Sequence, residues 1–140
     1  MNKNGFTLVE LLATIVILGV VMLIGTVSIT GVKNKINENN FKTKLELIIS
    51  NAERWGQDNK ETLSTAQTKT VKNLIDLNYI EPDTGSVVTN NINGKSLNTL
   101  SIKVYLNYNR VYACIKKTTT NKNLLGDNSS YSKYAAYYCL

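Results

Sequence analysis

The sequence predicts an α+β fold in which a long amino-terminal helix, hydrophobic in its first half, packs its second half on a small antiparallel sheet. No charged residue occurs from 11 to 32, and beyond this run apolar residues recur at steps of three and four. From 100 to 107 apolar and polar residues alternate, as in a half-buried strand. The length of 140 residues is that of one domain.

The composition argues against an enzyme. The chain has a net charge of +6 and 43% hydrophobic residues, with no histidine and two cysteines. The commonest general base and metal ligand is therefore missing. The carboxylates are scattered, no glycine-rich phosphate loop is present, and the hydroxyl residues have no candidate base. We expect no catalytic residue, no metal site and no cofactor.

The first 32 residues are organised like a membrane anchor. A short leader, residues 1–5, carries Lys3 and precedes the apolar segment 6–32. As a helix this segment is roughly 40 Å long, enough to cross a hydrocarbon core of about 30 Å. Lys3 favours a cytoplasmic amino terminus, although Lys33 and Lys35 compete with it. Residues 33–140 then form the globular domain.

Glu10 is an unusual residue at the start of an apolar segment. A carboxylate within a membrane helix costs on the order of 3 kcal/mol, less near the interface, and usually has a partner. Cleavage after Gly5 would create an ammonium group on Phe6, and a neighbouring chain's terminus could then neutralise Glu10. The alternative is a simple signal anchor in which Glu10 lies among lipid head groups.

Residues 5–12, Gly-Phe-Thr-Leu-Val-Glu-Leu-Leu, resemble the processing and methylation motif of type IV prepilins and pseudopilins. The resemblance covers about the first quarter of the chain. It implies that a prepilin peptidase cleaves after Gly5, that Phe6 becomes the methylated terminus, and that Glu10 sets the register of the filament. It also implies a cytoplasmic-membrane precursor that joins other pilins, as a homo- or hetero-polymer, on a pilus assembly platform and ends in an extracellular pilus.

A single helix is predicted from Phe6 to Gln57. Its second half carries one apolar stripe. The stripe comprises Ile29, Val32, Ile36, Phe41, Leu45, Ile48, Ala52 and Trp55. Gly19, Gly25 and Gly31 either soften the helix or let neighbouring helices approach closely, and we favour close packing.

The remainder of the chain predicts a short helix and a small sheet. A threonine-capped helix is expected from 68 to 77, and Asn93-Gly94 indicates a hairpin turn between 87–88 and Leu97. Strands are expected at 100–107, 111–116 and 134–139, for a sheet of three or four strands. This architecture resembles the lollipop shape of pilins.

Cys114 and Cys139 are expected to form a disulfide, the alternative being two buried free thiols. The pairing would resemble the disulfide-bounded carboxy-terminal loop of many type IV pilins. Basic and aromatic residues in this region are candidates for weak DNA or host-surface binding, although a solvated face is the commoner explanation. They are Lys116, Lys117, Lys122, Tyr131 and Lys133.

Three functions remain open. The favoured one is a major or minor pilin of a type IV pilus, serving adhesion, motility or DNA uptake. The second is a pseudopilin of a type II secretion machine. Major pseudopilins typically bind calcium in a carboxy-terminal loop, where this chain has only Asp127 as an acidic ligand. The third is a membrane-anchored module that binds DNA or another ligand without polymerising.

Overall fold

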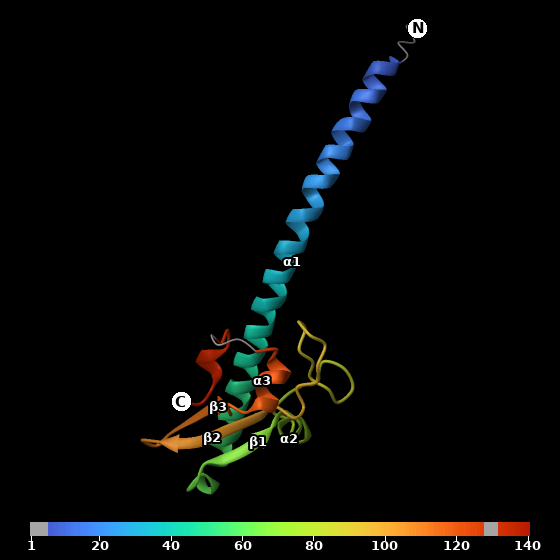
Figure 1. Ribbon diagram of the computed structural model, residues 1–140. Helices are drawn as coiled ribbons and strands as arrows, with labels where there is room; N and C mark the ends of the chain where they lie inside the picture. The colour runs from blue at the N-terminus through green and yellow to red at the C-terminus, as the bar shows by residue number, and fades with distance from the viewer. Residues whose placement is uncertain (1–5, 128–131) are drawn as a thin grey trace. The chain divides into compact units, whose positions relative to one another are not determined.

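One helix, α1 (Leu8–Asp58), dominates the chain. The structure is a computed structural model that describes residues 6–127 and 132–140, with side chains throughout except at 24–28. The chain divides into two compact units at the boundary between Asn37 and Glu38. The later elements of the second unit, in chain order, are η1 (Lys60–Thr62), β1 (Gln67–Thr70), α2 (Val71–Asp76), β2 (Ser101–Asn107), β3 (Arg110–Ile115), α3 (Thr119–Leu125) and η2 (Ala135–Tyr137) (Figure 1).

In the first unit the apolar side chains of α1 are exposed. Leu8 and Leu23, near the two ends of the described apolar stretch, are 81% and 72% exposed. Ile29, Val32 and Ile36 are also more than half exposed, so the first three members of the predicted stripe are not covered by this chain. Among the residues described with their side chains, no helix is long and apolar enough to span a membrane.

In the second unit the helix stripe is buried. Phe41, Leu45 and Ala52 are fully buried, and Ile48 and Trp55 nearly so. They join one hydrophobic cluster with the inward-facing residues of the sheet, among which Ile102 and Val104 are fully buried. This half of α1 therefore packs on the sheet as predicted, and the α+β fold class is confirmed.

The sheet has three antiparallel strands in the order β1-β2-β3. Strands β2 and β3 form a hairpin in which Tyr105 lies opposite Tyr112 and Asn107 opposite Arg110. Its two-residue turn, Tyr108-Asn109, has positive φ angles at both positions, 46° and 64°. This is the pattern of a type I′ turn, whose twist matches that of the flanking strands.

One predicted boundary was wrong in the middle of the chain. Residues 67–70 form β1 instead of the first turn of a helix, and they pair with β2. The helix α2 begins at Val71, because the Thr70 hydroxyl accepts the Asn73 N–H and the Asn73 side chain accepts the Thr70 N–H. The turn predicted at Asn93-Gly94 is present: Thr89 and Ser96 form an antiparallel bridge, and the Leu97 N–H donates to the Val88 carbonyl at 2.7 Å. This pairing is an isolated bridge and not a pair of regular strands.

The predicted carboxy-terminal strand was also wrong. Residues 135–137 form the 3₁₀ helix η2, and Tyr138 makes only an isolated parallel bridge to Ile115. Tyr134 and Tyr138 are both buried, but Ala136 between them is exposed. A strand would place all three on one face, so this pattern suits a turn of helix better. The helix α3, inside the disulfide loop, was not predicted.

Candidate functional site

The amino-terminal end of α1 is closed by a reciprocal set of hydrogen bonds between Thr7 and Glu10. The backbone N–H and the hydroxyl of Thr7 each donate to Glu10 Oε2 at 2.9 Å. In return, the Glu10 N–H donates to Thr7 Oγ1 at 3.3 Å. This is a capping box, which satisfies backbone donors that have no partner within the helix.

The capping box gives Glu10 a role within a single chain. Its carboxylate lies near the positive end of the helix dipole, where a negative charge is favourable. Phe6, immediately before the box, is 81% exposed, and Gly5 lies outside the described residues. Sequence reasoning missed Thr7, although a threonine followed three residues later by glutamate before an apolar run is the signature of such a cap.

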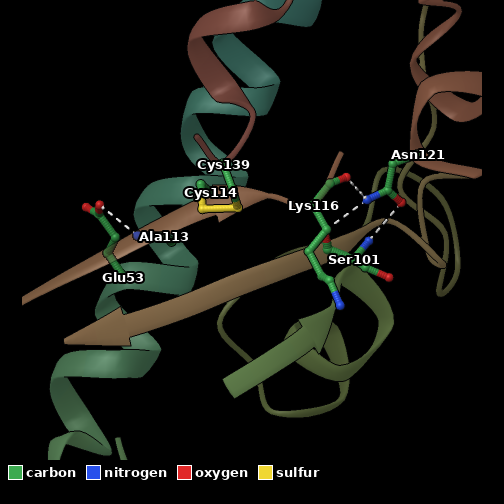
Figure 2. The surroundings of a disulfide bond; sticks show 7 residues. All are labelled: Glu53, Ser101, Ala113, Cys114, Lys116, Asn121 and Cys139. Carbon is green, nitrogen blue, oxygen red and sulfur yellow. Dashed lines mark hydrogen bonds between the residues drawn. A yellow bond between two sulfur atoms is a disulfide. The ribbon is translucent and has the colours of Figure 1, made fainter. Parts of the chain in front are cut away.

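The second candidate region is the loop closed by Cys114 and Cys139. These cysteines form a disulfide across a sequence separation of 25, with their Cα atoms 5.0 Å apart (Figure 2). Cys114 belongs to β3, and the Cys139 N–H donates to the carbonyl of Ile115 at 2.9 Å. The disulfide therefore attaches the carboxy-terminal segment to a strand of the sheet.

Asn121 holds the middle of the same loop against the sheet. Its side-chain amide donates to the carbonyls of Ser101 and Lys116 at 3.0 and 2.7 Å, and its carbonyl accepts the Ser101 N–H at 3.1 Å. Figure 2 shows these bonds beside the disulfide, with Glu53 of α1 accepting the Ala113 N–H. Asn121 is 1% exposed, so these bonds form away from water.

Comparison with protein-family models identifies the amino-terminal segment. Residues 1–26 match the model described as the prokaryotic N-terminal methylation motif. The chain carries the type IV prepilin leader signature. No curated protein and no solved structure matches the chain. The resemblance drawn from residues 5–12 is thereby confirmed. The motif supports a pilin or pseudopilin precursor and points to a structural subunit.

The basic residues predicted to bind a surface occupy different settings in the structure. Lys117 is exposed just after β3, whereas the neighbouring Lys116 is half-buried. Lys122 lies on α3, and Lys133 is 3.9 Å from Glu38 in an ion pair. Tyr131 lies outside the described residues. Binding by this set of residues stays a prediction.

The Asp127 carboxylate forms hydrogen bonds within the disulfide loop. It is 4% exposed, and its Oδ2 accepts hydrogen bonds from the Ser132 hydroxyl and, at 3.1 Å, from the Tyr138 hydroxyl. Burial and this bond raise the pKa of Tyr138 above its usual range. Within residues 6–127 and 132–140, no group of three or more potential metal-ligating His, Cys, Asp or Glu residues is present.

Proposed function

We propose that this chain is a subunit of a type IV pilus, cleaved after Gly5 and polymerised through the first half of α1. The observation that carries the proposal is the exposed apolar surface of α1 directly behind the methylation motif. Leu11, Leu12 and Ile15 are 56–61% exposed. Apolar surface in water is unfavourable in free energy, and lipid or the helices of other subunits would cover it. Segment 6–32 would serve as the membrane anchor before assembly and as the filament core afterwards.

Glu10 is the residue whose role best tests polymerisation. In the free chain its carboxylate caps its own helix, and in the filament we expect it to meet the ammonium of a neighbouring Phe6 as well. The two roles need different properties, because a cap needs only an acceptor oxygen, whereas charge neutralisation needs a carboxylate. Glu10→Gln keeps the acceptor and removes the charge, and Glu10→Val removes both.

The test is electron microscopy of filaments in cells that express the wild-type chain, Glu10→Gln, Glu10→Val or the control Glu61→Gln, which alters an exposed carboxylate of η1. We expect wild-type and Glu61→Gln cells to make filaments and both Glu10 variants to lose them. Intact-mass measurement should show removal of residues 1–5 and one added methyl group. Normal filaments from Glu10→Val cells would contradict the proposal and favour the non-polymerising module.

A pilus is better supported than a secretion pseudopilus by the carboxy-terminal loop. The disulfide is typical of the pilins that the sequence resembles, and Asp127 already accepts two hydrogen bonds from the protein. A calcium-binding pseudopilin should melt at a higher temperature in calcium than in a chelator. We expect equal melting temperatures, and a clear increase with calcium would favour the pseudopilin.

A further inference from the structure

The outward face of the β2–β3 hairpin carries two tyrosines and two cations in mutual contact. Tyr105 and Tyr112 lie opposite each other, with ring centroids 5.8 Å apart and planes 23° from parallel. Lys103 Nζ lies 5.4 Å from the centroid of the Tyr105 ring, and Arg110 Cζ lies 5.5 Å from that of Tyr112. The rings and cations therefore form one continuous cluster of aromatic and cation–π contacts.

This cluster faces away from the core. Ile102 and Val104 are fully buried, and side chains alternate between the faces of a strand, so Lys103 and Tyr105 point to the opposite side of the sheet. Tyr112 and Arg110, paired across the hairpin with Tyr105 and Asn107, lie on that same outward side. On that side Lys103 and Arg110 are exposed and the two tyrosines are half-buried. The cluster is thus partly accessible to a partner.

Tyr108, at the tip of the hairpin, adds a third ring. It is 98% exposed, and its φ angle of 46° lies in the left-handed region that a bulky side chain rarely adopts. Asparagine or glycine would fit this turn position better. In Figure 1 the tip lies at the far left, clear of the other elements. A strained backbone that holds an aromatic ring in solvent points to a contact made by that ring.

The charge around the hairpin has a single sign in the sequence. No aspartate or glutamate occurs from 84 to 126, a stretch that includes all of β2 and β3. The same stretch contains six cations: Lys95, Lys103, Arg110, Lys116, Lys117 and Lys122. A ligand of the hairpin face would therefore meet positive charge, and no carboxylate of β2 or β3 opposes it. Glu53 of α1, which accepts the Ala113 N–H of β3, is a carboxylate from another element.

We propose that Lys103, Tyr105, Tyr108, Arg110 and Tyr112, the hairpin platform, bind single-stranded nucleic acid. The exposed Tyr108 ring, the accessible parts of the Tyr105 and Tyr112 rings and the guanidinium plane can stack on unpaired bases, and the two cations can contact phosphates. A duplex keeps its bases stacked on each other, so it can use only the cations. The platform is separate from the assembly surface of α1, and this activity does not depend on polymerisation.

The test measures fluorescence anisotropy of a labelled oligothymidine, about 16 nucleotides long, with the full-length purified chain in detergent. Tyr108→Asn removes the exposed ring and suits the turn backbone, so we expect it to fold normally and to bind about 10-fold more weakly. Lys103→Gln should lower the slope of log affinity against log salt concentration by about 0.7, the value for one phosphate contact. A duplex of the same length should bind more weakly than the single strand.

One charge-matched control accompanies these variants. Lys72→Gln alters an exposed lysine of α2 that pairs with Asp76. It should keep wild-type affinity. The proposal is overturned if the wild-type chain does not bind the oligonucleotide at low salt, or if Lys72→Gln loses as much affinity as Lys103→Gln.

Two further outcomes would assign the platform to other partners and also overturn the proposal. Equal binding of a sulfated polysaccharide, unchanged by Tyr108→Asn, would show a surface that recognises only negative charge. Loss of filaments in Tyr108→Asn cells, with unchanged oligonucleotide affinity, would show an interface between copies of this chain.

Discussion

The two units of the chain use apolar residues in opposite ways within one helix. Before Asn37, Leu12 and Val16 of α1 are more than half exposed. After Glu38, Phe41 and Leu45 of the same helix are fully buried against the sheet. The second unit therefore has its own hydrophobic core, whereas the described apolar surface of the first unit has no cover from this chain.

This difference separates stability from assembly. Burial of a large aliphatic or aromatic side chain contributes about 1.5 to 3 kcal/mol, and in the second unit that energy supports the fold of a single chain. In the first unit the same kind of apolar surface gains this free energy only when lipid or another subunit covers it. Substitutions in the first unit should therefore affect assembly, and those in the second should affect unfolding.

The largest expected effect comes from Phe41→Ala compared with Leu12→Ala. Phe41 is fully buried and meets Tyr134 edge to face, with ring centroids 5.4 Å apart. Its truncation should lower the free energy of unfolding by about 3 to 5 kcal/mol. Leu12→Ala should leave that free energy unchanged and reduce the yield of filaments. Urea denaturation followed by Trp55 fluorescence measures the first effect and electron microscopy the second.

Equal destabilisation by Phe41→Ala and Leu12→Ala would contradict the separation of the two units. The same would follow if Leu12→Ala lowered the urea midpoint of the chain in detergent while leaving filament yield intact.

The next effect comes from the disulfide, which constrains only the second unit. Replacing Cys114 and Cys139 together by alanine should lower the free energy of unfolding by about 3 to 4 kcal/mol, because the unfolded chain regains the freedom of the loop. The helical circular dichroism of α1 should persist in detergent below the unfolding transition. Treatment of the wild type with a thiol reductant is the matched control and should reproduce the loss.

The elements best predicted from the sequence are those with a strong period. The helix stripe from Phe41 to Trp55 and the alternation in β2 each follow one periodicity over enough residues to decide the structure. The capping box of Thr7 and Glu10 also has a local signal, a threonine followed three residues later by glutamate, but it was not predicted.

The elements that were wrong depend on contacts distant in sequence. β1 is a strand because residues 67–70 pair with β2, more than 30 residues later in the sequence. The helix α3 has local signals at both ends, the Thr118 cap and Gly126 with φ of 70°. Its attachment to the sheet depends on the buried amide of Asn121, which bonds to Ser101, 20 residues earlier. A local pattern of polar residues does not show which distant residues they will pair with. The hairpin platform could have been found, since a two-residue turn at 108–109 places Tyr105 opposite Tyr112.

The same change, glycine to alanine, at two positions of α1 tests the difference between the units. A Cβ at Gly56 would lie 2.6 Å from Val111 Cγ1 and 2.7 Å from Val104 Cγ1, both core atoms. Gly56→Ala should therefore lower the free energy of unfolding by about 1 to 3 kcal/mol. A Cβ at Gly31 meets nothing within 4 Å, so Gly31→Ala should stabilise the isolated helix by up to about 1 kcal/mol.

Filament yield measures the effect of the same glycine substitutions on assembly. If the small residues of the first unit allow close helix approach, Gly31→Ala should reduce assembly while raising helicity in detergent. Unfolding curves and filament counts measured on the same preparations decide the outcome. A Gly56→Ala variant as stable as the wild type would refute the close packing of α1 against β2 and β3.

The smallest expected effect is acid sensitivity at the ion pair that attaches the segment after α2 to α1. Lys44 Nζ lies 2.6 Å from Asp83 Oδ2 and also donates to Thr89 O at 2.9 Å and to Asn91 Oδ1 at 2.8 Å. Partial burial opposes ionisation of Asp83, but Lys44 and the Thr89 N–H outweigh it and hold the pKa of Asp83 below its usual value.

A carboxyl group with a lowered pKa stabilises the fold above its unfolded pKa of about 3.9, and this contribution is lost as the pH falls through the folded value. Asp83 is partly exposed, so solvent screening limits the effect to about 1 kcal/mol or less. Asp83→Asn should be less stable than the wild type at neutral pH, and the difference should shrink in acid. Urea midpoints at neutral and acid pH measure this difference.

Asp76→Asn, which breaks the exposed pair with Lys72, is the matched control and should show a smaller change. A difference between Asp83→Asn and wild type that stays constant with pH would mean that hydrogen bonding, and not charge, holds this segment to α1.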